Sequence, residues 1–286
     1  MTAAALAAAQ SPGTDAMSRR NFARLATHIY QASGIKMPES KKTMLEGRLR
    51  RRLRATGIAT LDGYCDFLFS GSNLAAEGMH LLNAVTTNKT DFFREPAHFD
   101  FLARRAIPEF RRNGVRNIRA WSAACSTGPE PYSIAMVLEA AADAHGDFNY
   151  GILATDLDTE VLTAARAGIY AEELAEPVPT ALARRYVMTA RDSRRGQVRM
   201  APRLRSAIGF AQLNLMADHY PVGDPFHLVF CRNVLIYFDK PTQRKVVTQL
   251  VECLEPGGYL FLGHSESITG LELPLTQVAN TVFRKG

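Results

Sequence analysis

The sequence predicts a doubly wound α/β sheet with a small N-terminal all-helical domain and an inserted small β hairpin. From about residue 117 onward, short apolar runs typical of strands alternate with helical periodicity, and this alternation predicts a mainly parallel sheet covered by helices. Between residues 18 and 82 the periodicity is helical alone. A break between residues 170 and 205 combines a helical stretch with a basic hairpin, expected at about 186–206.

Three segments of the N-terminal domain show helical periodicity: 19–33, 41–57 and 60–70. In the second, Leu45, Leu49 and Leu53 form one apolar stripe, because residues four apart share a helix face. Five arginines lie within residues 48–54 without an interleaved acid. This pattern favours a basic ridge that binds an acidic partner, with a merely solvated helix face as the alternative.

Six segments of the second domain are typical of strands: 117–124, 149–156, 207–214, 226–233, 258–264 and 276–284. Residues 75–95 are expected to connect the two domains, with 83–95 contributing to the ligand site of the large domain at 96–286. In doubly wound sheets ligands bind at the carboxyl ends of the strands. The side chains that directly follow each strand are therefore the candidate functional residues.

Composition limits the class of protein. The chain of 286 residues is 47% hydrophobic, and this is enough apolar material for a full core. Its net charge is +6. No stretch reaches the roughly 18 uncharged apolar residues of a membrane helix, and residues 1–17 are expected to be a disordered lead-in. The four cysteines are scattered, and no His or Cys has metal-ligand spacing. We therefore expect reduced thiols, a cytoplasmic protein and no metal.

The turn after the first strand, "WSAACSTGPEPYS" at 121–133, resembles a nucleotide-binding loop in position but not in charge. It has one glycine, Gly128, and an acid, Glu130, at the start of the next helix, where a phosphate site needs exposed N–H groups and no carboxylate. Asp156 ends the second strand, where an acid can bind a ribose diol, whereas Asp158 is placed to cap the next helix. S-adenosylmethionine carries a ribose and cationic groups but no phosphate, and so it satisfies both observations.

Five motifs follow one another along the chain: "TTNKTDFFRE" (86–95), "WSAACSTGPEPYS" (121–133), "ATDLDTEVLTAARAGIY" (154–170), "FCRNVLIYFDK" (230–240) and "GHSE" (263–266). In sequence and in order they resemble the motifs of the chemotaxis receptor glutamate methyltransferases, the CheR family. The resemblance runs from about residue 18 to the end of the chain. It implies a Rossmann-like methyltransferase sheet that binds S-adenosylmethionine and releases S-adenosylhomocysteine.

The resemblance also implies roles for matching residues. Cofactor contacts are expected from Asn88, Thr90, Arg94, Glu130, Asp156, Asn214, Leu215, Asn233 and Val234. Arg94 and Tyr237 are expected at the transferred methyl group. The docking expectation comes from the basic helix face itself: a glutamate-rich methylation region is a negative surface, so Arg48, Arg51 and Arg52 are expected in substrate docking.

Several of these side chains have simpler readings. Asn214 and Asn233 could instead shape turns, because Asn bonds nearby backbone readily. Tyr237 could be a core tyrosine. Phe92 and Phe93 are expected to pack, and His264 is expected to be structural because no nucleophile accompanies it.

The implied activity is methyl-ester formation on glutamate side chains of methyl-accepting chemotaxis receptors, by a monomer that acts on their cytoplasmic helical domains without inserting into the membrane. Two other functions stay open: a nucleic-acid methyltransferase, which the absence of an N/D-P-P-Y/F motif disfavours, and a catalytically silent receptor adaptor. We expect no nucleic-acid partner. The hairpin stretch "TARDSRRGQVRM" has arginines where tethering relatives have glycines, so we expect action without a tether, with capture of an acidic tail as the alternative.

Overall fold

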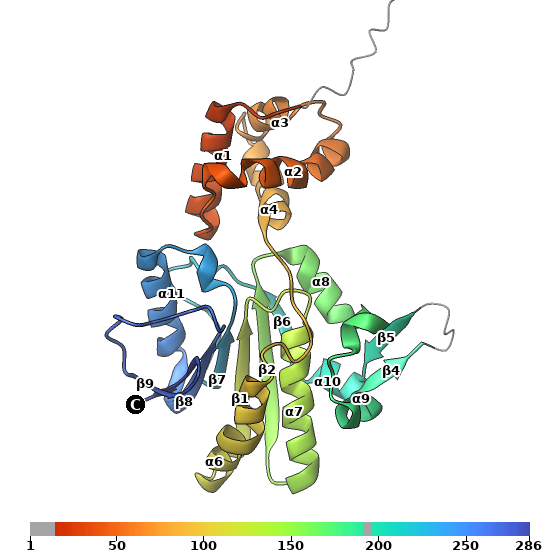
Figure 1. Ribbon diagram of the computed structural model, residues 1–286, viewed down its shortest axis with the longest axis vertical. Helices are drawn as coiled ribbons and strands as arrows, with labels where there is room; N and C mark the ends of the chain where they lie inside the picture. Colours follow the sequence, from red (N-terminus) through yellow and green to blue (C-terminus); the bar gives the residue numbers. More distant parts are fainter. Residues whose placement is uncertain (1–14, 191–195) are drawn as a thin grey trace, which may run out of the picture. The chain divides into compact units, whose positions relative to one another are not determined.

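The computed structural model describes residues 15–190 and 196–286, and the chain divides into two compact units (Figure 1). One unit contains the chain up to Gln31 together with Met37–Val85, and the other contains Ala32–Lys36 and Thr86–Gly286. Residues 1–14 of the expected lead-in lie outside the described residues. Met17 was also expected in that lead-in, but it is buried because its thioether side chain packs into the helical unit.

The first unit is helical. Its elements are α1 (Arg19–Ser33), a 3-10 turn (Glu39–Lys41), α2 (Lys42–Thr56), α3 (Leu61–Leu68) and α4 (Asn73–Val85). The predicted stripe is confirmed, since Leu45, Leu49 and Leu53 are all buried. Helix α2 ends at Gly57, whose φ of 74° is the left-handed conformation that favours glycine at a helix end.

Helix α4 continues the helical unit to Val85, three residues beyond the expected boundary at 82, and the connection that was expected from about residue 75 begins only after this helix. The apolar pattern of this helix is masked because Glu77 and Asn83 are buried within it. Glu77 is tolerated there because Arg52 donates two hydrogen bonds to it, at 2.8 and 3.0 Å, and the Tyr64 hydroxyl donates a third at 3.0 Å. A buried carboxylate with this many donors can belong to a core.

This contact also changes the picture of the basic ridge. Arg52 lies on the packed side of α2 and is committed to Glu77, and Arg48 donates to the carbonyl oxygen of Val85. Arg51 and Arg54 are exposed. Of the three predicted docking residues, Arg52 is therefore bound to a partner within the protein. The exposed part of the basic ridge includes Arg51 and Arg54.

The second unit is built on a seven-stranded sheet in the order β6-β2-β1-β7-β8-β10-β9. Its strands are β1 (Asn117–Ala123), β2 (Asn149–Asp156), β6 (Ile208–Gln212), β7 (Phe226–Cys231), β8 (Leu254–Leu262), β9 (Leu275–Ala279) and β10 (Val282–Lys285). The first five pair in parallel, and β10 runs antiparallel to β8 and β9. The strand order reverses between β1 and β7, which makes their carboxyl ends the switch point.

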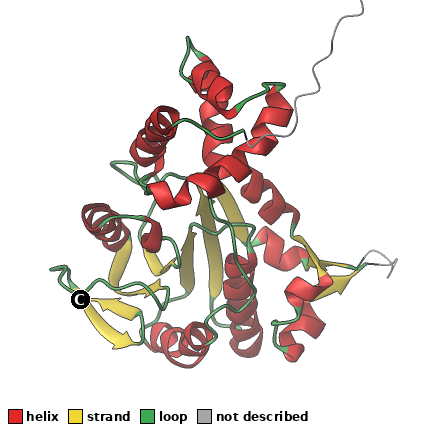
Figure 2. Cartoon of the chain, turned by 45° about the horizontal axis from the view of Figure 1, so that its top comes forward, coloured by secondary structure: helices red, strands yellow, loops and turns green. Residues whose placement is uncertain are grey.

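Helices cover both faces of this sheet (Figure 2). Ile118 and Ala120 face a core that contains the buried residues of α7 (Pro129–His145), while Trp121 and Ala123 face a second core that contains those of α11 (Lys240–Glu252). Successive side chains of a strand point to opposite faces, so the two cores confirm a doubly wound sheet. Further helices of this unit are α5 (Ala97–Phe101), a π-helical turn (Leu102–Ala106), α6 (Ile107–Arg112), α8 (Thr159–Ala167) and a 3-10 turn (Leu235–Tyr237).

The insertion is a second, three-stranded sheet rather than a hairpin alone. Strand β5 (Gln197–Met200) pairs antiparallel with β4 (Val187–Thr189) and with β3 (Ile169–Ala171) on its other side. It is accompanied by short helices at Glu172–Ala175, Thr180–Tyr186 (α9) and Pro202–Ser206 (α10). The arginines at 191, 194 and 195 lie outside the described residues, so the tethering expectation stays a prediction.

The end of the chain was predicted as one strand over 276–284 but forms a hairpin. Strands β9 and β10 pair through Ala279 and Val282, with Asn280 and Thr281 in the turn. Thr281 has a φ of 52°, and this local reversal inside a β-rich run is not visible in the hydrophobic pattern. None of the described helices is long and apolar enough to cross a membrane.

Candidate active site

Strained backbone gathers at the carboxyl ends of the central strands. Positive φ in a non-glycine residue costs of order 1–3 kcal/mol and clusters at functional sites. Five such residues follow β1 and β7 or precede α5, with φ between 50° and 67°: Phe93, Glu95, Ala124, Ser126 and Asn233. This edge is therefore the candidate active site.

Asp156 shapes the loop after β1. Its carboxylate accepts the backbone N–H of Ser126 at 2.8 Å and that of Asp158 at 2.9 Å. Burial raises the pKa of Asp156, although these two N–H groups act to lower it. An ionised carboxylate has about four acceptor positions, so the side chain can hold the loop and still accept from a ligand.

Asp158 has the predicted capping role and a second role that the sequence did not show. Its Oδ1 accepts the N–H groups of Glu160 and Val161 at the start of α8. Its Oδ2 accepts the Thr86 hydroxyl at 2.9 Å and Asn88 Nδ2 at 2.8 Å. The segment after Val85 is thereby fixed to the end of β2.

Glu130 lies in the first turn of α7. One of its oxygens accepts the Ser122 hydroxyl at 2.6 Å, and the other lies 3.1 Å from Arg232 Nη1. Burial raises the pKa of Glu130, and Arg232 counters this only in part. An acid at a helix N-terminus is also stabilised by the helix dipole.

Arg232 connects Glu130 to Glu95. Its side chain is 2% exposed, and its Nη2 lies 2.9 Å from Glu95 Oε2. Burial would raise the pKa of Glu95, but the His264 N–H and the Arg232 guanidinium outweigh burial and hold that pKa below its usual value. With both acids ionised, two carboxylates surround one guanidinium, and the cluster has an unbalanced negative charge.

Two histidines adjoin this ion-pair cluster. His98 Nδ1 lies 3.5 Å from Glu95 Oε2, and the ring of His264 lies 3.9 Å from the same oxygen. That oxygen already accepts from Arg232. Burial, reinforced by Arg232, lowers the pKa of His98 to about 4, so its imidazole is neutral at pH 7. The geometry assigns the two rings to the surroundings of the ion pair, and the structural reading of His264 agrees with this position.

Glu266 explains the "GHSE" motif. Its carboxylate accepts the N–H groups of Gly263, Asn233 and Leu235, at 2.6, 3.0 and 2.7 Å. These donors follow β7 and β8, so one buried acid fixes the two strand ends to each other. Burial raises its pKa even against these bonds.

Comparison with known proteins decides the family. The CheR methyltransferase SAM-binding domain matches residues 88–283, and the CheR methyltransferase all-alpha domain matches residues 20–86. The chain belongs to the CheR methyltransferase family. Over 271 residues it is 44% identical to the chemotaxis protein methyltransferase of Escherichia coli K12, covering 94% of this chain and 91% of that protein. It is 43% identical to the Salmonella typhimurium protein of the same description, with the same coverage, and 37% identical over 268 residues to chemotaxis protein methyltransferase 2 of Pseudomonas aeruginosa, covering 93% of each.

S-adenosylmethionine is the cofactor of this CheR domain, and the residues present suit it. When both acids are ionised, Glu95, Glu130 and Arg232 leave one negative charge unbalanced at the strand ends, and this charge matches a ligand with a sulfonium and an ammonium group. Asp156 retains acceptor capacity for hydroxyl donors. The chemistry of the donor set therefore fits the cofactor named by the family.

Other predicted site residues are bonded within the protein. Asn214 accepts Met216 N–H at 2.9 Å and donates to Ala32 O at 2.6 Å, which is the turn-forming alternative for its side chain. Asn233 has a φ of 60° and donates to Glu95 at 3.3 Å. Leu215 is buried, and Val234 and Thr90 are half-buried.

The two residues predicted at the methyl group are half-buried. Arg94 donates to the carbonyl oxygen of Lys89 at 3.2 Å, and Tyr237 accepts Lys36 N–H at its own carbonyl oxygen. Phe92 and Phe93 are buried and pack edge-on or tilted against Tyr170 and Phe99, as expected for core aromatics.

Glu95, Arg232 and Glu266 are members of the site that were not predicted from the sequence. One signal was present: Arg232 directly follows the apolar run 226–231, and a charge at the end of a buried strand needs a partner. Nothing in the sequence identified Glu95 as that partner, because the two residues are 137 positions apart.

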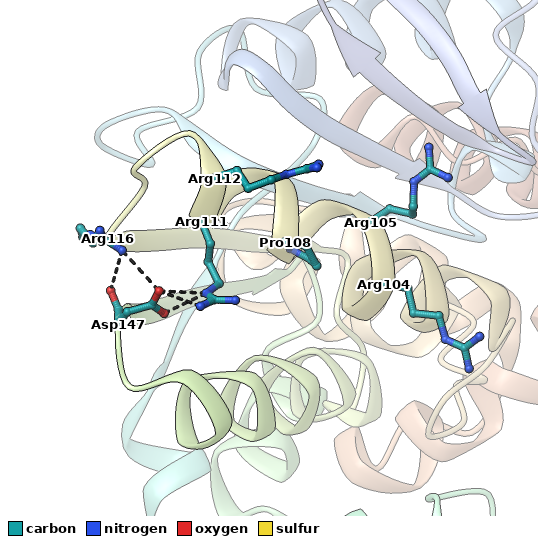
Figure 3. A pocket seen from close by; sticks show the side chains of 7 residues that line it. All are labelled: Arg104, Arg105, Pro108, Arg111, Arg112, Arg116 and Asp147. Atoms are coloured by element: carbon teal, nitrogen blue, oxygen red, sulfur yellow. Dashed lines mark hydrogen bonds and ion pairs between the residues drawn. The ribbon is translucent and has the colours of Figure 1, made fainter.

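A separate basic hollow of about 610 Å³ lies at the opposite end of the sheet (Figure 3). It is lined by Arg104, Arg105, Pro108, Arg111, Arg112, Arg116 and Asp147. Arg116 precedes β1 and Asp147 precedes β2, so the hollow is at the amino ends of the strands. Arg111 and Arg116 converge on Asp147. This hollow is not the predicted cofactor site.

Proposed function

We propose that this chain transfers a methyl group from S-adenosylmethionine to glutamate side chains on the cytoplasmic helices of chemotaxis receptors. The observation that carries the proposal is the match of both CheR domains in order, together with 44% identity to a chemotaxis protein methyltransferase over 94% of the chain. The product of this reaction is a glutamate methyl ester.

The strand-end residues supply the cofactor site. Glu130 would bind the cationic amino-acid end and Asp156 the ribose, while Asn88, Thr90, Arg94 and the pairs Asn214–Leu215 and Asn233–Val234 would line the rest. The bound cofactor supplies an electrophilic methyl group on a sulfonium. The unbalanced charge of the Glu95, Glu130 and Arg232 cluster supports this assignment.

The chemistry needs alignment more than proton transfer. A glutamate side chain has an ordinary pKa of about 4.3 and is already ionised at neutral pH, so the attacking oxygen needs no general base. Holding the reacting atoms in line and excluding water then provide the acceleration. Arg94 and Tyr237 would orient the carboxylate. A full ion pair from Arg94 to the attacking oxygen would lower its nucleophilicity, and orientation is therefore its role.

Receptor docking would use the exposed basic side chains of α2. The methylated surface of a receptor helix is rich in glutamate, and complementary charge raises the rate of productive encounter. Arg51 is exposed on α2, and Arg48 is half-buried beside it. Arg52 is assigned to Glu77 rather than to docking.

Incubation with labelled S-adenosylmethionine and a receptor signalling fragment tests the proposal. We expect base-labile label on the fragment, because a methyl ester hydrolyses in alkali. Label on added DNA or RNA would instead support the nucleic-acid alternative. Cofactor binding without transfer to any receptor fragment would support the silent adaptor.

A further inference from the structure

Arg232 is almost fully buried, yet the proposed reaction assigns no role to its side chain. Its Nη1 donates to Glu130, and its Nη2 donates both to Glu95 and to the carbonyl oxygen of Arg94. The guanidinium lies 5.7 Å from the ring centre of Phe99. A planar guanidinium can bridge acceptors in this way because its donors have a fixed geometry.

The segment that Arg232 holds is strained on both sides of Arg94. Phe93 has a φ of 50° and Glu95 a φ of 58°, and neither is a glycine. Such a conformation persists only where the surroundings over-determine it. Without fixed partners, the turn would relax and move the Arg94 side chain.

A second bond holds the other side of the same turn. The Phe93 N–H donates to the Ser133 hydroxyl oxygen at 3.0 Å, and that hydroxyl donates to Pro129 O at 2.7 Å within α7. Ser133 and Glu130 lie in the same helix. The turn is therefore fixed to α7 twice, once through Ser133 and once through Arg232 and Glu130.

We propose that Arg232 is a positioning residue that clamps the strained Phe93–Glu95 turn and so presents Arg94 to the reacting carboxylate. Arg232 acts through Arg94 and touches neither substrate nor methyl group. The proposal rests on the proposed function only for the role of Arg94. The clamp itself is a property of the folded chain and can be measured without substrate.

The test compares Arg232→Gln, Arg232→Lys and Ser133→Ala with the unmodified chain. Amide hydrogen exchange of a peptide spanning 88–98 reports the clamp, and kcat and KM on the receptor fragment report the reaction. We expect faster exchange in all three variants. For Arg232→Gln we expect kcat to fall about tenfold to a hundredfold with the receptor KM within about threefold, because a small misplacement of an aligning group acts on kcat.

The lysine variant separates positioning from stability. It keeps the positive charge between Glu95 and Glu130 but cannot make all the hydrogen bonds of the planar guanidinium. We therefore expect its Tm to return toward that of the unmodified chain, while its kcat stays low and amide exchange in 88–98 stays fast. Arg111→Gln is the matched control, because it removes a bidentate ion pair, from Nε to Oδ1 and from Nη2 to Oδ2 of Asp147, at the other end of the sheet. It should leave exchange in 88–98 unchanged.

Three results would overturn the proposal: unchanged exchange in 88–98 for Arg232→Gln, full recovery of kcat by Arg232→Lys, or a lowered Tm with kcat intact. If Arg232→Gln does not fold, amide exchange in 88–98 and kcat of the Arg232→Lys and Ser133→Ala variants still test the proposal. Failure of the unmodified chain to methylate the receptor fragment would count against the proposed function, while the exchange measurements would still test the clamp.

Discussion

The carboxylate of Asp158 accepts a hydrogen bond from Nδ2 of Asn88 at 2.8 Å, across 70 positions of the chain. The same carboxylate caps α8 through its other oxygen. One side chain thus starts a helix of the methyltransferase unit and fixes the segment that carries several predicted cofactor contacts. Its loss should have two separable effects, one on the helix and one on that segment.

We predict that Asp158→Ala lowers the free energy of unfolding by more than the loss of a cap alone, which costs about 1–2 kcal/mol. The excess arises because the Thr86 and Asn88 donors lose their acceptor. Urea unfolding followed by the fluorescence of the single tryptophan, Trp121, measures it in this unit. Asp239→Ala, which removes the N-cap of α11 together with a 3.8 Å ion pair to Lys36, provides the comparison. A loss for Asp158→Ala that is no larger than the loss for Asp239→Ala would count against a contribution from the Thr86 and Asn88 contacts.

Asp156→Ala should weaken S-adenosylmethionine binding by about 1–3 kcal/mol, the scale for hydrogen bonds to a charged group. Part of this loss will come from the loop, because Ser126 and Asp158 lose their acceptor. Calorimetry on folded protein measures the affinity. Exchange of the 124–128 amides then separates the two causes, since an affinity loss without loop opening points to a direct ribose contact. Unchanged affinity would contradict the ribose role.

Cofactor affinity should rise with pH through the range in which Glu130 ionises. Burial raises the pKa of Glu130 in the free protein above that of an ordinary glutamate. A cationic ligand favours the carboxylate and lowers this pKa in the complex, so binding should release protons at pH values between the lowered pKa of the complex and the raised pKa of the free protein. Calorimetry in buffers of different ionisation enthalpy detects the release. It should disappear in Glu130→Gln, and persistence there would assign it to another group.

The elements that could be predicted from the sequence differ physically from those that could not. The Leu45, Leu49 and Leu53 stripe could be predicted because burial of apolar side chains follows the helical period. Helix α4 and the Glu95–Arg232 pair could not, because the sequence does not show which distant residue is the partner of a buried charge. Only the partner distinguishes them, and Glu77 and Glu95 find their partners across long stretches of chain.

Charge reversal on α2 should raise the receptor KM. Arg51→Glu together with Arg54→Glu changes exposed side chains, and we expect a several-fold increase at low salt that shrinks at high salt, because screening shortens the reach of surface charges. Cofactor affinity should not change. Reversal of Arg104 and Arg105 in the basic hollow supplies a variant with the same change in net charge. An equal rise in KM for both double variants would mean that net charge, not the α2 surface, governs docking.

The ion pair of Arg52 with Glu77 should stabilise the helical unit without taking part in docking. Their side chains are 15% and 9% exposed, and removing one partner of a buried pair leaves the other charge uncompensated, at a cost of about 3 kcal/mol. Arg52→Met should therefore destabilise this unit, as measured by urea unfolding with exchange of the peptides at 42–56 and 73–85. Combining it with Glu77→Leu should recover most of the loss, because both charges are then gone and an apolar pair fills the space. Recovery should stay incomplete, since the Tyr64 hydroxyl loses its acceptor. If Arg52→Met instead left stability unchanged and raised the receptor KM, Arg52 would return to the docking surface.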